Sequence, residues 1–191
     1  MIKIAHRINT ISQLKETPKE YGIELDLRSQ SDDIIIHHDP FQTGENFEEF
    51  LKHYNHKLII LNTKEEGLEL RLLDLMNRHN ITNFFFLDLS LPFLIKTMKQ
   101  GVSDIAVRFS EFEPIEFVRK FKGKVDWVWI DCFTDLPLTE DNYAELKEHF
   151  RLCLVSPELQ GYDVSRIDEF KEKLSSMPVD AVCTKRPDLW G

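Results

Sequence analysis

Two acidic residues, Glu24 and Asp26, lie two positions apart in the apolar run GIELDL of this 191-residue chain. Residues two apart on an extended strand point to the same side, so both carboxylates should face one pocket. Two carboxylates that close repel each other unless a cation lies between them or one of them binds a proton. Ligand sets made only of oxygen favour Mg²⁺ or Ca²⁺ over zinc. The pair therefore predicts a divalent-cation site.

The same spacing recurs at Asn62 and Lys64, where the run KLIILN ends. Asn62 offers an amide oxygen to the cation, and Lys64 offers an ammonium group to an anion. A purely structural interpretation is the alternative: the carboxylates of Glu24 and Asp26 would form a network of ion pairs. Their partners in it would be Arg7 and Lys64.

Histidines stand at two further strand ends. His6 ends the run IKIAH, and His37 and His38 follow the apolar residues III. Adjacent residues on an extended run face opposite ways, so only one of this pair should face the pocket. We expect it to be His38, because it precedes Asp39 and the turn at Pro40. Imidazole titrates near neutral pH, which suits a general acid or base.

These residues need a scaffold that gathers strand ends, and the chain carries apolar runs of strand length throughout. The runs are 2–6, 22–27, 57–62, 83–89, 104–109, 126–133, 151–156 and 180–185. Helix-like segments lie between them, with Asn46, Ser90 and Thr139 as candidate N-caps and Pro114 opening another helix. This alternation predicts a compact (β/α)8 TIM barrel, a single domain over residues 1–191. A doubly wound open sheet is the alternative, but no glycine-rich turn follows the first strand.

Further polar side chains lie near the ends of the later strands: Asp88, Arg108, Asp131 and Glu158. We expect them to form a polar rim that binds the substrate, since acidic groups suit sugar hydroxyls or an amino alcohol. A ring of salt bridges that closes the mouth of the barrel is the alternative.

The composition suits a folded protein and argues against a nucleic-acid binder. The chain is 42% hydrophobic and 30% charged, and its net charge of −9 argues against nucleic acid and anionic membranes as partners. No apolar run is long enough to insert in a membrane, and MIKIAHR turns polar too early for a secretory signal. Three cysteines without a CxxC pair indicate a reducing compartment, so we expect a cytoplasmic protein. The oligomeric state does not follow from the sequence.

The motifs IAHR, ELD and HHDP, in this order, resemble the glycerophosphodiester phosphodiesterase family, part of the phosphatidylinositol-phospholipase-C-like barrels. The closing segment AVCTKRPDLW resembles that family's final strand. The resemblance covers the whole barrel, although its specific motifs lie within the first 64 residues. It implies a TIM barrel and a metal-dependent hydrolysis of phosphodiesters.

Carried over position by position, the catalytic residues would be His6, His38, Arg7 and Lys64, and the metal ligands Glu24, Asp26 and Asn62. The two histidines would be the acid–base pair. The two cationic side chains and Mg²⁺ or Ca²⁺ would neutralise the charge that develops on the phosphate in the transition state. In the resembling enzymes the attacking group can be a neighbouring hydroxyl of the substrate, which gives a cyclic phosphate that is then hydrolysed.

The chain also departs from the family's pattern. Asn62 replaces an acidic metal ligand, so weaker metal binding is expected. The segment usually inserted after the His-Asp motif is missing, which predicts a more open pocket. Such a pocket would either admit a bulky or polymeric phosphodiester or exclude water poorly. The segment LVSPELQGYD carries Glu158 where the family often has an aromatic residue, which argues against a simple glycerol headgroup.

The leading interpretation is a phosphodiesterase acting on a glycerophosphodiester-like or bulkier polar phosphodiester. One alternative is a non-catalytic barrel that binds a phosphorylated sugar or a lipid headgroup in the same pocket. Another is a metal-dependent lyase or isomerase that uses Glu24 and Asp26 on an enolate, and the flanking histidines argue against it.

Overall fold

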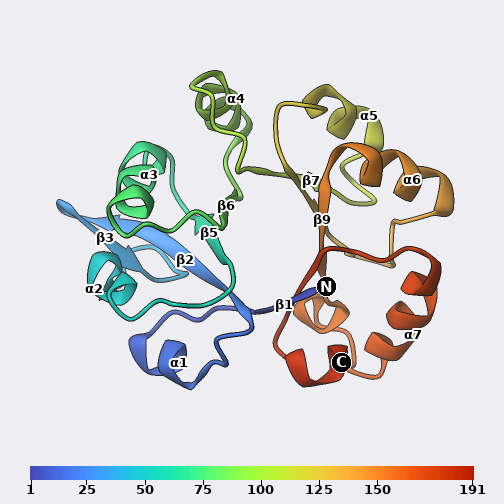
Figure 1. The fold of residues 1–191 in the computed structure, drawn as a ribbon, viewed down its shortest axis with the longest axis horizontal. Helices are drawn as coiled ribbons and strands as arrows, with labels where there is room; N and C mark the ends of the chain where they lie inside the picture. The colour runs from blue at the N-terminus through green and yellow to red at the C-terminus, as the bar shows by residue number, and fades with distance from the viewer. The chain divides into compact units, whose positions relative to one another are not determined.

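The computed structural model describes residues Met1–Gly191 as an α/β fold. The chain divides into two compact units. The N-terminal unit is His6–Val102, and the C-terminal unit combines Met1–Ala5 with Ser103–Gly191. Each unit contributes five strands, accompanied by helices that follow the strands (Figure 1).

The sheet of the N-terminal unit has the strand order β4-β3-β2-β5-β6. Its strands are β2 (Gly22–Gln30), β3 (Asp33–Ile36), β4 (Glu45–Asn46), β5 (Ile59–Thr63) and β6 (Phe84–Leu87). Strands β2, β5 and β6 run parallel, whereas β3 folds back antiparallel on β2. In the β2–β5 register Asp26 is opposite Asn62, so the sheet sets two predicted metal ligands side by side.

Four helices accompany this sheet: α1 (Ile11–Glu16), α2 (Phe47–Leu51), α3 (Glu69–Arg78) and α4 (Leu91–Lys99). Thr10 begins α1 with a capping box to Gln13, and the Asn46 side chain accepts the Glu49 amide at the start of α2. The expected Ser90 cap is wrong in detail, because the Ser90 hydroxyl bonds to Glu66 instead of to its own helix. Pro at the second position of α4 still begins that helix without needing an amide partner.

The sheet of the C-terminal unit is parallel throughout, with the order β1-β10-β9-β8-β7. Its strands are β1 (Ile2–Ala5), β7 (Ala106–Phe109), β8 (Trp127–Ile130), β9 (Arg151–Val155) and β10 (Ala181–Thr184). The helices are α5 (Ile115–Val118), α6 (Glu140–His149) and α7 (Arg166–Lys173), with short 3-10 turns at 119–121, 157–160, 174–176 and 187–190. Thr139 caps α6 through a capping box, as its position predicts.

All eight predicted strands form, as β1, β2 and β5 to β10. Most are shorter than the apolar runs that predict them, whereas β2 extends beyond residue 27 to Gln30 because its polar end pairs with β3. Every residue of β5, β6, β8 and β10 is buried, as expected of parallel strands covered on both faces. Trp127 and Trp129 are core residues of β8.

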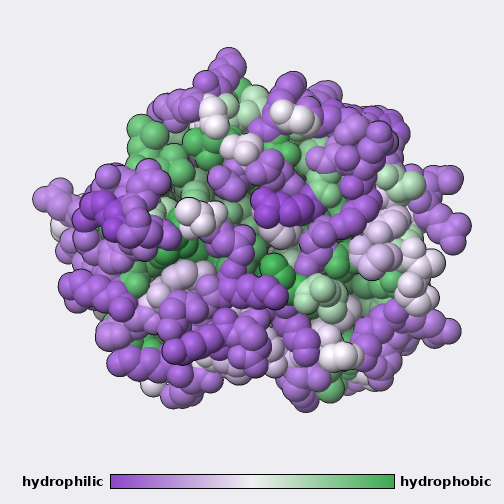
Figure 2. Space-filling model, viewed as in Figure 1, coloured by the Kyte–Doolittle hydropathy of each residue, from purple (hydrophilic) through white to green (hydrophobic).

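Polar and charged side chains cover most of the face shown in Figure 2, with smaller apolar areas between them. The three cysteines are buried and unbonded, at positions 132, 153 and 183. Among the helices, none combines the length and the apolar character needed to cross a bilayer.

Candidate functional site

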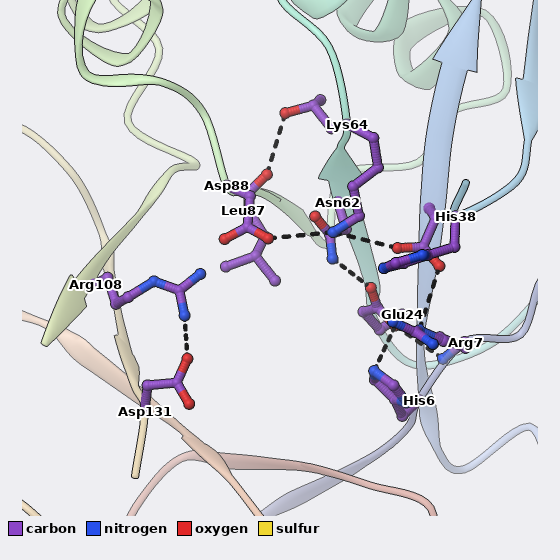
Figure 3. A network of polar contacts seen from close by, with 12 residues as sticks. His6, Arg7, Glu24, His38, Asn62, Lys64, Leu87, Asp88, Arg108 and Asp131 are labelled. Atoms are coloured by element: carbon purple, nitrogen blue, oxygen red, sulfur yellow. Dashed lines mark hydrogen bonds and ion pairs between the residues drawn. The ribbon is translucent and has the colours of Figure 1, made fainter. Parts of the chain in front are cut away.

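The ends of β2 and β5 and the segments that follow β1 and β3 bring most of the predicted site residues together in the N-terminal unit. They are His6, Arg7, Glu24, Asp26, His38, Asn62 and Lys64. In Figure 3 the labelled side chains of this group point toward one another around Glu24. Carboxyl ends of parallel strands meet at one edge of a sheet, which is why residues so far apart in sequence converge.

Glu24 is almost completely enclosed, with only 1% of its surface exposed. Its Oε1 accepts a hydrogen bond from Asn62 Nδ2 at 2.8 Å, and its Oε2 accepts one from the Arg7 amide at 2.8 Å. His6 Nε2 lies 3.8 Å from the same Oε2. Burial, and then the negative charge of Asp26, raise the pKa of Glu24 to about 7.

The backbone of Arg7 adopts an unusual conformation to make this contact. Its φ of 56° lies in the left-handed region, which non-glycine residues seldom occupy. The turn aims the Arg7 amide at the Glu24 carboxylate, and the next amide, of Ile8, bonds to the Glu24 carbonyl at 2.8 Å. Strained backbone of this kind persists where the surrounding contacts fix it, and it is common at functional sites.

Asp26 is fully buried between two cationic side chains. Lys64 Nζ lies 3.4 Å from its Oδ1, and Arg7 Nε lies 3.7 Å from its Oδ2. Asn9 holds the residue from both sides, because Asn9 Nδ2 donates to Oδ2 at 2.9 Å and the Asp26 amide donates to Asn9 Oδ1 at 3.1 Å. The ion pairs of the structural interpretation are thus present at Asp26.

Two buried oxygens of the site accept no hydrogen bond, Asp26 Oδ1 and Asn62 Oδ1. They belong to residues that face each other in the β2–β5 register. Buried polar atoms are normally bonded, so an unsatisfied pair of oxygens calls for an explanation such as a bound ion. The side chains of His, Cys, Asp and Glu alone form no group of three suited to a metal. A three-ligand site here therefore requires the Asn62 amide oxygen beside Glu24 and Asp26.

The two adjacent histidines differ in how their rings are held. His38 Nδ1 bonds to Asp39 Oδ1 at 2.8 Å, and this bond lowers the pKa of Asp39. His37 Nδ1 accepts the Asp39 amide at 3.0 Å, so that ring is tied to its own backbone. The bond at His38 Nδ1 leaves the Nε2 of that ring available. The His37 ring instead binds the main chain of the turn that follows β3.

Two grooves flank the site within the N-terminal unit. The larger has a volume of about 610 Å³ and includes Arg7, Asn9, His37 and His38 in its lining. The smaller, about 290 Å³, lies at the carboxyl ends of β5 and β6 and includes Lys64 and Asp88. Half of its other lining residues are acidic: Glu65, Glu66 and Glu69.

The four predicted rim residues fall in different units, Asp88 in the N-terminal unit and Arg108, Asp131 and Glu158 in the C-terminal unit. Lys64 Nζ lies 3.3 Å from Asp88 Oδ2. Arg108 pairs with Asp131, as Figure 3 shows.

The Glu158 carboxylate is bound by groups at the ends of β9 and β10. It accepts hydrogen bonds from the hydroxyls of Ser156 and Thr184 and from the Lys185 amide. These bonds join the segments that follow β9 and β10. Its role as a substrate ligand stays a prediction.

Sequence reasoning missed Asn9 and Arg28. Arg28 follows Asp26 by two residues on β2, so the alternation that singles out Glu24 and Asp26 also marks Arg28. Its side chain bonds to the carbonyls of His38 and Lys64. Asn9 lies in the loop before α1, where no periodicity indicates the direction of a side chain.

Comparison with solved structures finds the same fold in enzymes of known class. A glycerophosphodiester phosphodiesterase from Agrobacterium tumefaciens aligns with 100% of this chain and 99% of its own, at a TM-score of 0.74 and 13% identity. A glycerophosphoryl diester phosphodiesterase from Parabacteroides distasonis aligns with 98% of this chain and 84% of its own, at a TM-score of 0.67 and 12% identity. No family model and no curated protein sequence matches the chain. The resemblance that the motifs indicate is therefore confirmed at the level of the fold.

Proposed function

We propose that this protein is a metal-dependent phosphodiesterase that hydrolyses a glycerophosphodiester-like or bulkier polar phosphodiester. The observation that carries the proposal is the buried carboxylate pair of Glu24 and Asp26, with a cation on either side of Asp26 and a histidine close to Glu24. The fold shared with two phosphodiesterases supports the same reaction class. We also propose that the chain forms one closed (β/α)8 barrel, as the eight strand–helix repeats of the sequence suggest.

The residues present fit a hard divalent cation, Mg²⁺ or Ca²⁺. Glu24, Asp26 and Asn62 would hold it, since all three offer oxygen and two of them carry a buried oxygen that accepts no hydrogen bond. Bound there, the cation would supply positive charge next to the phosphate and so favour attack at phosphorus.

The chain's own cations would orient the phosphate. Arg7 can donate to two phosphate oxygens through its planar fork, and Lys64 supplies a point charge from the opposite side of Asp26. Both charges stabilise the extra negative charge of the transition state.

His6 and His38 would move the protons. One ring takes the proton of the attacking hydroxyl, and the other gives a proton to the leaving alkoxide. The Asp39 carboxylate on His38 Nδ1 fixes that ring and presents Nε2 to the substrate. His6 is set beside Glu24, whose carboxylate would stabilise the protonated ring.

The two grooves support a substrate that has a sizeable substituent on each side of its phosphate. A diester has a substituent on each side of its phosphorus, and Arg7 lines the larger groove whereas Lys64 lines the smaller one. A volume of about 610 Å³ in the larger groove leaves room for more than a glycerol unit.

A non-catalytic barrel that binds a phosphorylated sugar or lipid headgroup is the alternative. The bond from Asn62 Nδ2 to Glu24 favours it, because this hydrogen bond stabilises the Glu24 carboxylate without any metal. In that case the anion would bind to Arg7 and Lys64, and no turnover would follow.

The test is hydrolysis of bis(p-nitrophenyl) phosphate and of a panel of glycerophosphodiesters with Mg²⁺, Ca²⁺ or Mn²⁺. We expect metal-dependent turnover that is lost in His6→Ala and Glu24→Ala, with His53→Ala as the control because that histidine is exposed in the same unit. Titration calorimetry with each cation runs alongside. Absence of turnover together with absence of cation binding would reject the enzyme and leave the binding barrel.

A further inference from the structure

Arg28 makes a fork between two loops of the candidate site. Its Nε and Nη2 both donate to the His38 carbonyl, at 3.0 and 2.9 Å. Its Nη1 donates to the Lys64 carbonyl at 3.2 Å. One rigid guanidinium thus contacts the main chain of the proposed proton-transfer residue and of the proposed phosphate-binding residue.

The two loops have different origins, and Arg28 stands between them. His38 follows β3, which is antiparallel to β2, and Lys64 follows β5, which is parallel to it. Arg28 belongs to β2, the strand shared by both pairings, and is opposite Ile35 in the register with β3. From the end of β2 a single side chain therefore reaches both loop starts.

The Arg28 side chain binds main-chain carbonyl groups rather than an acidic side chain. It is half-buried, and its three hydrogen bonds end on carbonyl oxygens instead of a carboxylate. The Lys64 amide meanwhile bonds to the Leu27 carbonyl at 3.0 Å, so the Lys64 peptide is held on both of its sides by β2. A planar group with donors in fixed directions suits this task, and a lysine could replace only part of it.

We propose that Arg28 is a positioning residue that fixes the spacing between His38 and Lys64. The inference rests on the proposed function for its catalytic consequence, because His38 transfers a proton to a phosphodiester that Lys64 holds. A displacement of about 1 Å between such groups can lower a rate about 100-fold without weakening binding. Loss of Arg28 therefore lowers kcat more than it raises KM.

The experiment compares Arg28→Met, Arg28→Lys and wild type in steady-state hydrolysis of a phosphodiester. The matched control is Arg71→Met, which also removes a guanidinium that donates to a backbone carbonyl, that of Asp32, in the same unit. We expect kcat to fall about 10- to 100-fold in Arg28→Met with KM changed less than about threefold. Arg28→Lys should recover part of the loss, and Arg71→Met should match wild type.

Hydrogen exchange followed by mass spectrometry separates this proposal from the proposed function. In Arg28→Met, exchange should become about tenfold faster in both loop segments, 37–40 and 63–66, while the helices keep wild-type rates. An inactive wild type would reject the phosphodiesterase but leave this readout intact. If either loop of Arg28→Met exchanged at the wild-type rate, the proposed role of Arg28 would be overturned. If the wild type is active, an unchanged kcat in Arg28→Met would overturn it as well.

Discussion

Asn62 and Glu24 form a buried hydrogen bond, from Asn62 Nδ2 to Glu24 Oε1 at 2.8 Å. The amide gives the carboxylate a neutral donor at a position where a third carboxylate would repel it. The same amide leaves its oxygen without a hydrogen bond, and so does Asp26 Oδ1 on the paired strand. Asn62 thus donates to the carboxylate pair in the absence of a cation, and in the proposed metal site its oxygen would be a ligand.

Asn62→Asp should destabilise the metal-free protein and strengthen its binding of a divalent cation. A carboxylate at position 62 removes the donor to Glu24 and adds a third buried negative charge, so the metal-free protein should lose about 1–3 kcal/mol of unfolding free energy at pH 8. The added charge should tighten Ca²⁺ or Mg²⁺ binding about tenfold. Urea denaturation in chelator and calorimetry measure the two effects. Asn55→Asp is the control, because Asn55 is exposed; equal effects in both variants would contradict this account of Asn62.

The unfolding free energy of the metal-free protein should depend on pH through Glu24. Its pKa is about 7 in the folded protein and about 4.5 without the burial, so the folded state binds the proton more tightly than the unfolded state. The stability from this proton is complete below pH 4.5 and is lost as pH rises through 7, a change of roughly 3 kcal/mol. Urea denaturation in chelator between pH 5 and 8 measures it. Glu24→Gln should flatten the curve, and a variant as steep as wild type would assign the effect to another group.

Substitutions of the adjacent histidines, His37 and His38, should differ in their effect on kcat. His38→Ala should lower kcat about 100-fold or more, because a positioned general acid or base contributes at least that factor. His37→Ala should lower it less than about tenfold, since its ring bonds only to the Asp39 backbone. Steady-state hydrolysis of one phosphodiester by both variants is the measurement. The reverse order would exchange the roles of the two rings.

Asn9 should control cation affinity without being a ligand. Its side chain fixes Asp26 through one bond to the carboxylate and one from the amide. Loss of such a partner behind a metal ligand costs about 10- to 100-fold in affinity, so Asn9→Ala should weaken binding of Ca²⁺ or Mg²⁺ by that factor. Calorimetry beside Asn55→Ala, an exposed asparagine of the same unit, provides the comparison. Wild-type affinity in Asn9→Ala would show that Asp26 holds its position without Asn9.

The sequence by itself determined the strands and the direction of the residues on them. Alternation along an extended chain is local geometry, so the spacing of Glu24 and Asp26, and of Asn62 and Lys64, is enough to put each pair on one face. Buried strands also follow from continuous apolar runs, and all eight form. The identity of the ionisable residues at the strand ends was therefore readable before any fold was known.

Tertiary structure alone decided how those residues are held. Asn9 reaches Asp26 across 17 residues, and Arg28 reaches Lys64 across 36, along paths set by the loops. The left-handed turn at Arg7 and the burial that raises the pKa of Glu24 have the same origin. Loop paths and burial depend on how distant elements pack, and packing leaves no periodic signal in the chain. The chemistry of the site is thus local in sequence, whereas its geometry and electrostatics are not.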